Sequence, residues 1–547
     1  MNINRFNYRY IFILFLLASG LFSCEENQNS VDWILINGKI LTVDKDFTIV
    51  EAIAIKDSCI VGTGTTKEML SLTSSSTEVT DLKGQTVIPG LIDNHMHFVR
   101  AAKHWYRMVR WDNITSRKEA LEMVKNRAEK LPKDEWVIVM GGFIFDQFKD
   151  NSTLFTINEL DSILPNQPLF IQEGYSRAFV NTAALKAAGL LNNKKPKHLE
   201  NLKKNNGMIL GRTQAMKILS NAIPEPSIKV WDESLTIAMD SLLRMGLTTV
   251  YDVGGNTVNL SFYESIKRFA ANDALKIRFF YSLNEQNSAS GSAEEIINEL
   301  QNNRPNFKDL QNAQFGYGET VYRPMRAHPF KVTDEDQEHF RNIVTTAIKN
   351  DWQIHEHSLQ EEKVKTMLDN LEKVAESYPK MKDLRFTIAH TNGMSEESIQ
   401  RAINLNMVFA VHSSSRLMSK RRYESGAKSP PIKKINEMGG IWGLGSDGTT
   451  VASPNPFHTI DWVISGRNIA GNKYMTQLIS REDALRAHTA TNAYLLFREK
   501  DLGSLETGKR ADFIVLNKDY MTIPNEEIKN LHSVLSVVNG KIVYASN

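Results

Sequence analysis

The amino-acid sequence predicts an α/β fold: a (β/α)8 TIM barrel beside a composite β-sandwich built from both chain termini, with an insertion after the first barrel strand. Three observations lead to this prediction. Strand-like apolar runs alternate with amphipathic helical runs through the middle of the chain, and short strand-like segments fill both ends. An apolar run over residues 87–92 also leads directly to two histidines, His95 and His97, at a strand end where barrel enzymes carry out chemistry.

The first thirty residues are expected to form a leader and a tether. Arg5 and Arg9 precede an apolar stretch over residues 11–22, which has the length of a signal peptide's central region and is shorter than the roughly 20 residues of a membrane-spanning helix. The stretch leads to Cys24 and resembles a bacterial lipoprotein cleavage box. We expect residues 1–23 to be a lipoprotein signal peptide, Cys24 to carry the lipid and residues 24–30 to be the tether; an ordinary secretory signal or an uncleaved anchor is the alternative.

The two β-rich ends are expected to form one small sandwich. Residues 31–88 contain strand-like segments at 33–36, 39–43, 49–56 and 58–61, with a turn signal at Asn37-Gly38. Residues 504–547 continue the pattern, with a hairpin signal at Asn539-Gly540. These two segments enclose the barrel region, residues 89–503.

Eight segments of the middle region are the predicted barrel strands. They are residues 91–97, 248–253, 277–283, 315–320, 353–358, 385–390, 408–413 and 442–447. The gap between the first two is too long for one loop and one helix, so residues from about 100 to 235 are expected to contain the insertion. Long ordered excursions from the active face of a barrel commonly shape the substrate pocket.

The composition and charge of the chain limit the kinds of molecule that it is expected to bind. Of the 547 residues 41% are hydrophobic, the formal net charge is +2, and basic and acidic residues are interspersed, which argues against nucleic-acid binding. The partners that we expect are a small-molecule substrate and a membrane reached only through the N-terminal lipid, in the bacterial cell envelope on the periplasmic or outer-membrane face. We also allow for a homodimer.

Ionisable residues recur at or next to the carboxyl ends of the predicted strands. Besides the histidine pair of the first strand, they are Glu319, His355, His357, His390 and Asp447. Neutral imidazoles and carboxylates suit Zn²⁺ or a similar divalent ion, which lowers the pKa of a bound water toward about 7 and polarises a carbonyl. Asp447 is the predicted proton shuttle from that water to a leaving nitrogen.

Several motifs resemble the amidohydrolase superfamily. They are residues 89–97, the Gly-Ser-Asp at 445–447 and the closing segment 503–515, whereas segments 178–185 and 246–252 are similar to its branch called amidohydrolase family 3. The resemblance covers nearly the whole chain after the leader. It implies a metal-bearing barrel beside a composite sandwich, and hydrolysis of a carbon-nitrogen bond other than an ordinary peptide bond, in an amide, N-acyl, N-formyl or cyclic amide substrate.

The resemblance also assigns metal ligands to four strands. These are His95 and His97 on the first strand, His357 on the fifth, His390 on the sixth and Asp447 on the eighth. His355 lies two residues before His357 and is the alternative fifth-strand ligand. His357 is favoured because His-Ser-Leu-Gln leads into the helix as the family's segment does.

The chain departs from the family pattern at the fourth strand. Many relatives carry there a carboxylated lysine that bridges two metals, but this sequence has Gly316-Tyr317-Gly318-Glu319. Glu319 is therefore a bridging carboxylate, a ligand of a single metal or a substrate-binding residue, which leaves the number of ions at one or two.

Three further residues are candidates for substrate binding. Arg177 follows Tyr175-Ser176, where relatives often carry a histidine; it either pairs with an acidic substrate group or lies in a solvated loop. Asn181 belongs to the family-like segment 178–185. Trp105 either lines an apolar pocket or, as we favour, packs the insertion onto the barrel. His104, His328 and His412 match no motif position and are not expected to be ligands.

Two other functions remain open. The same site would also suit an esterase or a lactonase, because the attacked carbonyl is similar. From a different class, an envelope lipoprotein that had lost catalysis would use the barrel as a binding module.

Overall fold

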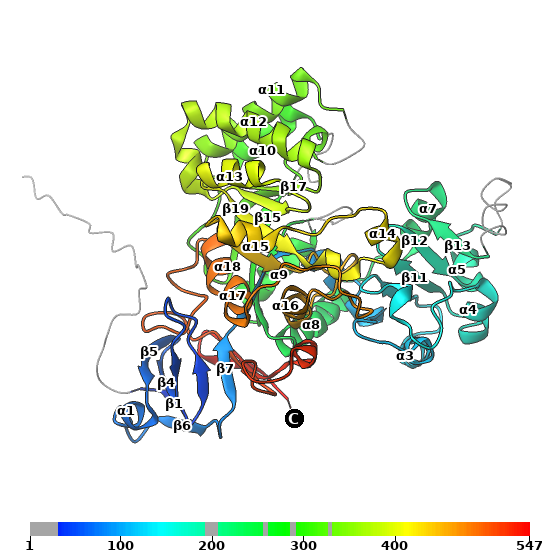
Figure 1. The fold of residues 1–547 in the computed structure, drawn as a ribbon. Coiled ribbons are helices and arrows are strands. Elements are labelled where there is room, and N and C mark those ends of the chain that lie inside the picture. Colours follow the sequence, from blue (N-terminus) through cyan, green and yellow to red (C-terminus); the bar gives the residue numbers. More distant parts are fainter. Residues whose placement is uncertain (1–30, 192–205, 255–260, 285–290, 327–330, 547) are drawn as a thin grey trace, which may run out of the picture.

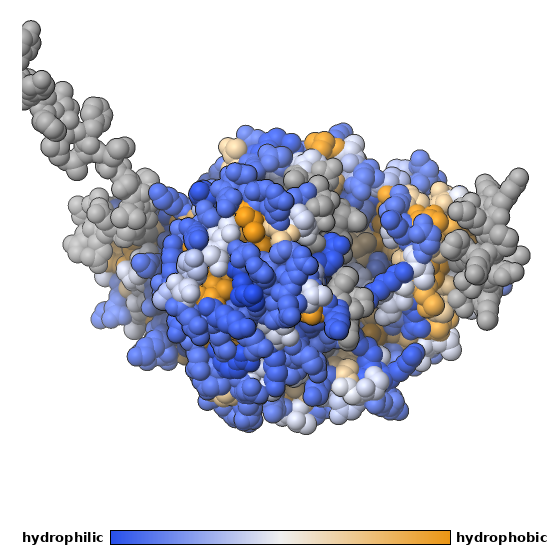
Figure 2. All heavy atoms as spheres, turned by 90° about the horizontal axis from the view of Figure 1, so that it is seen from above, coloured by the Kyte–Doolittle hydropathy of each residue, from blue (hydrophilic) through white to orange (hydrophobic). Residues whose placement is uncertain are grey.

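The computed structural model describes residues 31–191, 206–254, 261–284, 291–326 and 331–546. The predicted leader, Cys24, the tether and His328 lie outside these residues. Within the described residues, no helix combines the length and the apolarity needed to cross a bilayer. Figure 2 shows one face of the molecule as mainly hydrophilic, with apolar side chains in small separate areas.

A barrel of eight parallel strands forms the centre of the molecule, as predicted (Figure 1). The strands are β8 (Leu91–Met96), β14 (Leu247–Asp252), β15 (Arg278–Leu283), β16 (Asn312–Glu319), β17 (Gln353–Ser358), β18 (Thr387–His390), β19 (Val408–His412) and β20 (Trp442–Gly445). Each strand pairs in parallel with its neighbour from β8 through to β20. The backbone N–H of Asp447, just after β20, donates to the His95 carbonyl at 2.8 Å, so the last strand lies against the first.

Helices cover the outside of the barrel. They are α8 (Ile228–Arg244), α9 (Ser261–Ala271), α10 (Ala293–Asn302), α11 (Asp334–Lys349), α12 (Glu361–Ser377), α13 (Glu396–Asn404), α15 (Ile432–Glu437), α16 (Pro456–Ser465), α17 (Arg481–Ala487) and α18 (Ala490–Leu495). The longest ones show why these segments are helical. In α8 the Ser227 hydroxyl caps the first turn, and Trp231, Leu235, Ala238 and Leu242 form a buried stripe at helical spacing.

Two sheets from both chain ends form the composite sandwich. Their strands are β1 (Trp33–Ile36), β2 (Lys39–Leu41), β3 (Ile49–Val50), β4 (Ala52–Lys56), β5 (Cys59–Gly64), β6 (Glu78–Asp81), β7 (Thr86–Pro89), β21 (Phe513–Leu516), β22 (Ser533–Val538) and β23 (Lys541–Ala545). The sheet orders are β5-β4-β1-β6 and β23-β22-β21-β7-β2-β3. The antiparallel pairing of β7 with β21 joins the two ends of the chain, so this part of the predicted fold class is confirmed.

Gly90 joins the sandwich directly to the barrel, between β7 and β8. A Cβ atom at this position would lie 2.1 Å from the Oγ1 atom of Thr248 at the start of β14. Because that space is filled, a larger residue would push the first two barrel strands apart, which explains the glycine at this junction.

The insertion after the first barrel strand is a separate layer with its own sheet. It contains β9 (Met108–Val109), β10 (Val137–Met140), β11 (Leu169–Glu173), β12 (Arg177–Val180), β13 (Met208–Leu210), α3 (Arg117–Glu129), α4 (Ile157–Ile163), α5 (Thr182–Ala187) and α7 (Gln214–Ala222). Alternate residues of β10 enter two different apolar clusters, Val137 and Val139 on one side and Ile138 and Met140 on the other. Side chains therefore cover both faces of this sheet.

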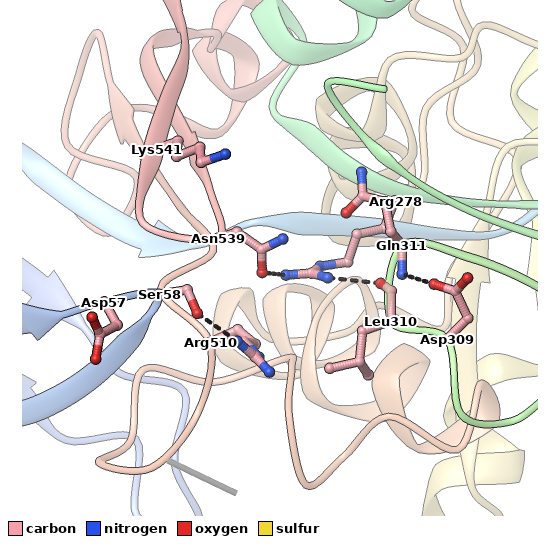
Figure 3. A pocket seen from close by; sticks show the side chains of 9 residues that line it. All are labelled: Asp57, Ser58, Arg278, Asp309, Leu310, Gln311, Arg510, Asn539 and Lys541. Carbon is pink, nitrogen blue, oxygen red and sulfur yellow. Dashed lines mark hydrogen bonds between the residues drawn. The ribbon is translucent and has the colours of Figure 1, made fainter. Parts of the chain in front are cut away.

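A cavity of about 460 Å³ lies where the sandwich meets the amino end of the barrel strands (Figure 3). Arg278, the first residue of β15, is fully buried beside it. Its guanidinium donates to both oxygens of Asp512 at 2.6 and 2.9 Å, to the Asn539 side chain at 2.6 Å and to the Leu310 carbonyl at 2.7 Å. This network ties the barrel to the C-terminal strands of the sandwich.

We expect the substitution Arg278→Met to lower the free energy of unfolding by about 3 kcal/mol, because it leaves the Asp512 carboxylate buried without its partner. Urea unfolding followed by circular dichroism measures this loss. The control is Arg268→Met, which breaks an ion pair with Asp232 whose arginine is 45% exposed and should cost less than about 1 kcal/mol. Equal losses in both variants would contradict the structural role of Arg278.

Candidate metal centre

The predicted ligands are buried at the carboxyl ends of five barrel strands. His95 and His97 lie two residues apart at the end of β8, so their side chains face the same side. Four other residues come from later strand ends: Glu319 ends β16, His357 lies in β17, His390 ends β18 and Asp447 follows β20. The parallel strands thus bring together residues separated by more than 300 positions.

These six side chains form two groups, each able to hold one ion. In the first group, His95, His97 and Asp447 place one potential ligand atom each within 4.8 Å of the others. The shortest of these separations is 3.2 Å, between His97 Nε2 and Asp447 Oδ1.

Glu319, His357 and His390 form the second group. Oε2 of Glu319 lies 2.7 Å from Nδ1 of His357 and 3.3 Å from Nε2 of His390. This group therefore has two imidazoles around one carboxylate.

The Glu319 carboxylate faces both groups at once. Its Oε2 atom lies 3.4 Å from Nε2 of His95, and its Oε1 atom lies 3.6 Å from Nε2 of His97. Of the three roles open to Glu319 from the sequence, this position suits a bridging carboxylate between two ions.

His355 lies behind the ligands. Its Nε2 atom lies 2.8 Å from Nδ1 of His95, whereas the neighbouring His357 faces Glu319. The structure thus gives the two histidines different positions. The contact with His355 occupies Nδ1 of His95 and directs Nε2 toward the carboxylates, which is how a second layer of residues orients a metal ligand.

His412 was not expected to be a ligand, but its potential ligand atom lies within 4.8 Å of those of His95 and His390, so the three form a further group able to hold an ion. Its ring centre lies 3.9 Å from that of His95, and its Nδ1 atom lies 3.0 Å from Nδ1 of His390. Its position at the end of β19, one more strand end of the same barrel face, is the signal that could have identified it. His104 instead contacts Arg107 at the start of the insertion.

Charge and protonation suit a divalent cation. Burial lowers the pKa of His95 and takes that of His357 to about 3, so both imidazoles are neutral at pH 7. Burial would raise the pKa of Glu319, but its electrostatic interaction with His357 and hydrogen bonds from the surrounding histidines hold it well below its usual range. The pKa of Asp447 is also lowered, because a hydrogen bond from His97 and the electrostatic interaction with His390 outweigh burial. Neutral imidazoles beside ionised carboxylates are the donor set of zinc and similar ions.

Two further observations indicate that these side chains suit a divalent cation. Nε2 of His95 is buried and has no hydrogen-bond partner among the described residues, although two carboxylates lie close to it. In His97 the Nδ1 atom lies 2.6 Å from the carbonyl of Gly254, which can only accept a hydrogen bond. Nδ1 of His97 therefore carries a proton, and Nε2 is the atom that faces Asp447.

Two arginines that sequence reasoning missed lie within electrostatic reach of the site. Nη2 of Arg326 lies 3.3 Å from Oε1 of Glu319 and 3.5 Å from Nδ1 of His357. Arg100 donates to the Tyr175 hydroxyl of the insertion at 2.9 Å. Burial opposes the charge of Arg100, yet Tyr175, Asp447 and Glu319 raise its pKa. Its place three residues after the histidine pair is the only sequence signal for it.

The three residues predicted to bind substrate make contacts within the protein. Arg177 is half-buried and pairs with Glu173 at 2.5 Å inside the insertion. The Asn181 side chain caps α5 and bonds the Leu169 N–H and two carbonyls, which leaves no group for a substrate. Trp105 is buried and donates to Ser241 of α8, which agrees with packing of the insertion onto the barrel.

Comparison with known proteins agrees with the family resemblance seen in the sequence. The model of a family described as the amidohydrolase family matches residues 78–544. N-substituted formamide deformylase of Arthrobacter pascens is 22% identical over 562 residues, covering 94% of this chain and 98% of that protein.

Two solved structures share the fold. A metal-dependent hydrolase from Pyrococcus horikoshii OT3 has a TM-score of 0.63 at 18% identity, covering 90% of this chain and 99% of that one. Atrazine chlorohydrolase TrzN from Arthrobacter aurescens TC1, complexed with zinc, has a TM-score of 0.54 at 17% identity, with coverages of 94% and 95%.

Proposed function

Because this chain belongs to the amidohydrolase family, we propose that it is a metal-dependent hydrolase that cleaves a non-peptide carbon-nitrogen bond. The observation that carries the proposal is the convergence of four imidazoles and two carboxylates, from five strand ends, at one buried point. A binding module would have no need for two adjacent groups of ionised and neutral metal ligands, which are costly to bury without an ion.

We propose that the site holds two divalent ions, with zinc as the expected metal. His95, His97 and Asp447 would hold one ion, and His357 and His390 the other, with Glu319 shared between them. When bound, the ions would polarise the scissile carbonyl and lower the pKa of the attacking water.

Asp447 is the proposed proton shuttle. It follows the last strand, its backbone N–H is fixed to the His95 carbonyl, and its lowered pKa keeps the carboxylate ionised at neutral pH. An ionised carboxylate at this position accepts a proton from the attacking water and passes it to the leaving nitrogen as the bond breaks.

We propose that Arg100 and Arg326 recognise the substrate. Two guanidinium groups beside the carboxylates would bind an acidic or carbonyl group and hold the scissile bond over the metal ligands. N-acyl and N-formyl derivatives that carry a free carboxylate are therefore the first compounds to test, and the similarity to a formamide deformylase supports the N-formyl group.

The test is a substrate panel assayed with protein of measured metal content. The panel contains N-formyl and N-acyl amino acids, the matching neutral amides, cyclic amides, and esters and lactones. We expect turnover of a carbon-nitrogen substrate that disappears after chelation and returns when zinc is added. Faster turnover of esters or lactones would favour the esterase alternative. Purified protein that holds no transition metal and turns over none of these compounds would contradict the proposal.

A further inference from the structure

A buried arginine away from the metal ligands has too few partners for its charge. Arg416 lies in η6 (Ser413–Leu417), directly after β19, and is 3% exposed. Its Nη2 atom donates to the side-chain oxygen of Asn113 in the insertion at 2.5 Å. Its Nε and Nη1 atoms are buried, and neither has a hydrogen-bond partner in the part of the chain that the structure describes.

Asp461 and Asp112 act on this guanidinium electrostatically, but neither carboxylate pairs with it directly. Within the described ranges, no carboxylate oxygen comes within the 4.0 Å of an ion pair with Arg416. An arginine side chain does not escape by losing its proton, and a buried charge without a partner is strongly unfavourable. The buried Arg278 shows the contrast, because Asp512, Asn539 and Leu310 engage its donors. Arg416 therefore has no anion in direct contact among the described residues.

The space for such a partner lies next to it. Arg416 lines a cavity of about 380 Å³ between α16, the segment 467–473, η7 (Asn525–Asn530) and two residues of the insertion. Five cationic side chains line this cavity: Lys149, Arg416, Arg467, Lys473 and Lys529. Two carboxylates, Asp461 and Glu526, also line it, and none of the candidate metal ligands does. The cavity is thus a second, cationic site, separate from the metal centre.

We propose that this cavity binds a small oxyanion, a carboxylate or a phosphate group, on the guanidinium of Arg416. The planar fork of an arginine matches two oxygens of such a group. Asn113 holds the guanidinium in place, and its own amide lies 2.7 Å from Nε2 of the buried His458, whose Nδ1 lies 2.8 Å from the Ser453 hydroxyl. The donor is thus oriented before the anion arrives.

The position of the cavity suggests what binding does. Its walls come from the insertion, from the barrel and from the C-terminal segment that contains η7. An anion held there would connect these three parts and stabilise the insertion beside the active face of the barrel. This site is independent of the proposed hydrolysis, because it shares no residue with the metal cluster.

Isothermal titration of the metal-loaded protein tests the proposal, with inorganic phosphate in one arm and acetate or succinate in the other. We expect saturable one-to-one binding in at least one arm, weakened about tenfold or more by Arg416→Gln at unchanged metal content. The control Arg422→Gln removes the same charge from an exposed position in α14 (Lys420–Glu424) and should leave binding unchanged. The arm with the tighter binding identifies the source of the oxyanion. Absence of saturable binding in both arms, or equal binding by Arg416→Gln, would overturn the proposal.

A second variant keeps the test decisive if Arg416→Gln does not fold. Asp461 lines the same cavity from α16 and is 8% exposed, so its carboxylate opposes a bound anion. We expect Asp461→Asn to bind the anion about threefold to tenfold more tightly, because a nearby like charge is removed. Unchanged or weaker binding in this variant would count against the site.

Discussion

The substitution Asp447→Asn is expected to reduce kcat/KM about 1,000-fold, because the amide keeps the shape of the carboxylate but accepts no proton from the attacking water. The structure gives this residue the required surroundings. Its Oδ1 lies 3.2 Å from Nε2 of His97, and its carboxylate is ionised at neutral pH because neighbouring histidines lower its pKa. The measurement is steady-state kinetics on the best substrate of the panel, together with elemental analysis.

Metal content distinguishes a lost proton shuttle from a lost ion. The asparagine oxygen still reaches the ligand position, so the variant should retain most of its metal while turnover falls. Asp161→Asn is a suitable control, since that carboxylate accepts hydrogen bonds from Thr182 at the start of α5 in the insertion and is not among the candidate metal ligands. A kcat/KM of Asp447→Asn within a factor of ten of the unmodified protein would exclude Asp447 as the shuttle, whatever its metal content.

The barrel and the metal cluster were predictable because both follow from local patterns. Each strand is a short apolar run, and parallel strands bring their carboxyl ends to one face, so residues such as His95 and Asp447 meet without any tertiary information. Strand periodicity alone did not separate His355 from His357, because both face one side of β17; His357 was favoured on the family resemblance. The two histidines have different neighbours because they lie at different positions along β17. His355 contacts His95, whereas His357 contacts Glu319.

The residues predicted to bind substrate make contacts within the protein that the sequence reveals to different degrees, and their role in substrate binding stays a prediction. Asn181 precedes a short helix and could have been identified as its N-cap from the sequence. Arg177 depends on Glu173, four residues away along a tight turn between strands. Arg100, Arg326 and Arg416 were missed because their importance comes from contacts between distant segments, which no spacing along the chain reveals.

Glu319 decides how many ions the site holds. Its two oxygens lie within 3.6 Å of imidazole nitrogens from four histidines that belong to both ligand groups. Replacing it with alanine removes the shared negative charge and the carboxylate that lies close to histidines of both groups. The proposal of two ions therefore predicts a loss of metal as well as a loss of activity.

We expect Glu319→Ala to reduce bound zinc from about two equivalents to one or fewer, as for a two-metal site that loses its bridge. kcat/KM should fall about 1,000-fold, since the stabilisation that a metal ion gives the transition state is worth several kcal/mol. Elemental analysis and kinetics measure both effects. Glu299→Gln is the control, because that carboxylate accepts a hydrogen bond from the Tyr317 hydroxyl and is not among the candidate metal ligands. Unchanged zinc and unchanged activity would remove Glu319 from the ligands. Loss of activity with full zinc would instead make it a substrate-binding residue, and the departure from the family pattern at the fourth strand would then concern specificity rather than metal binding.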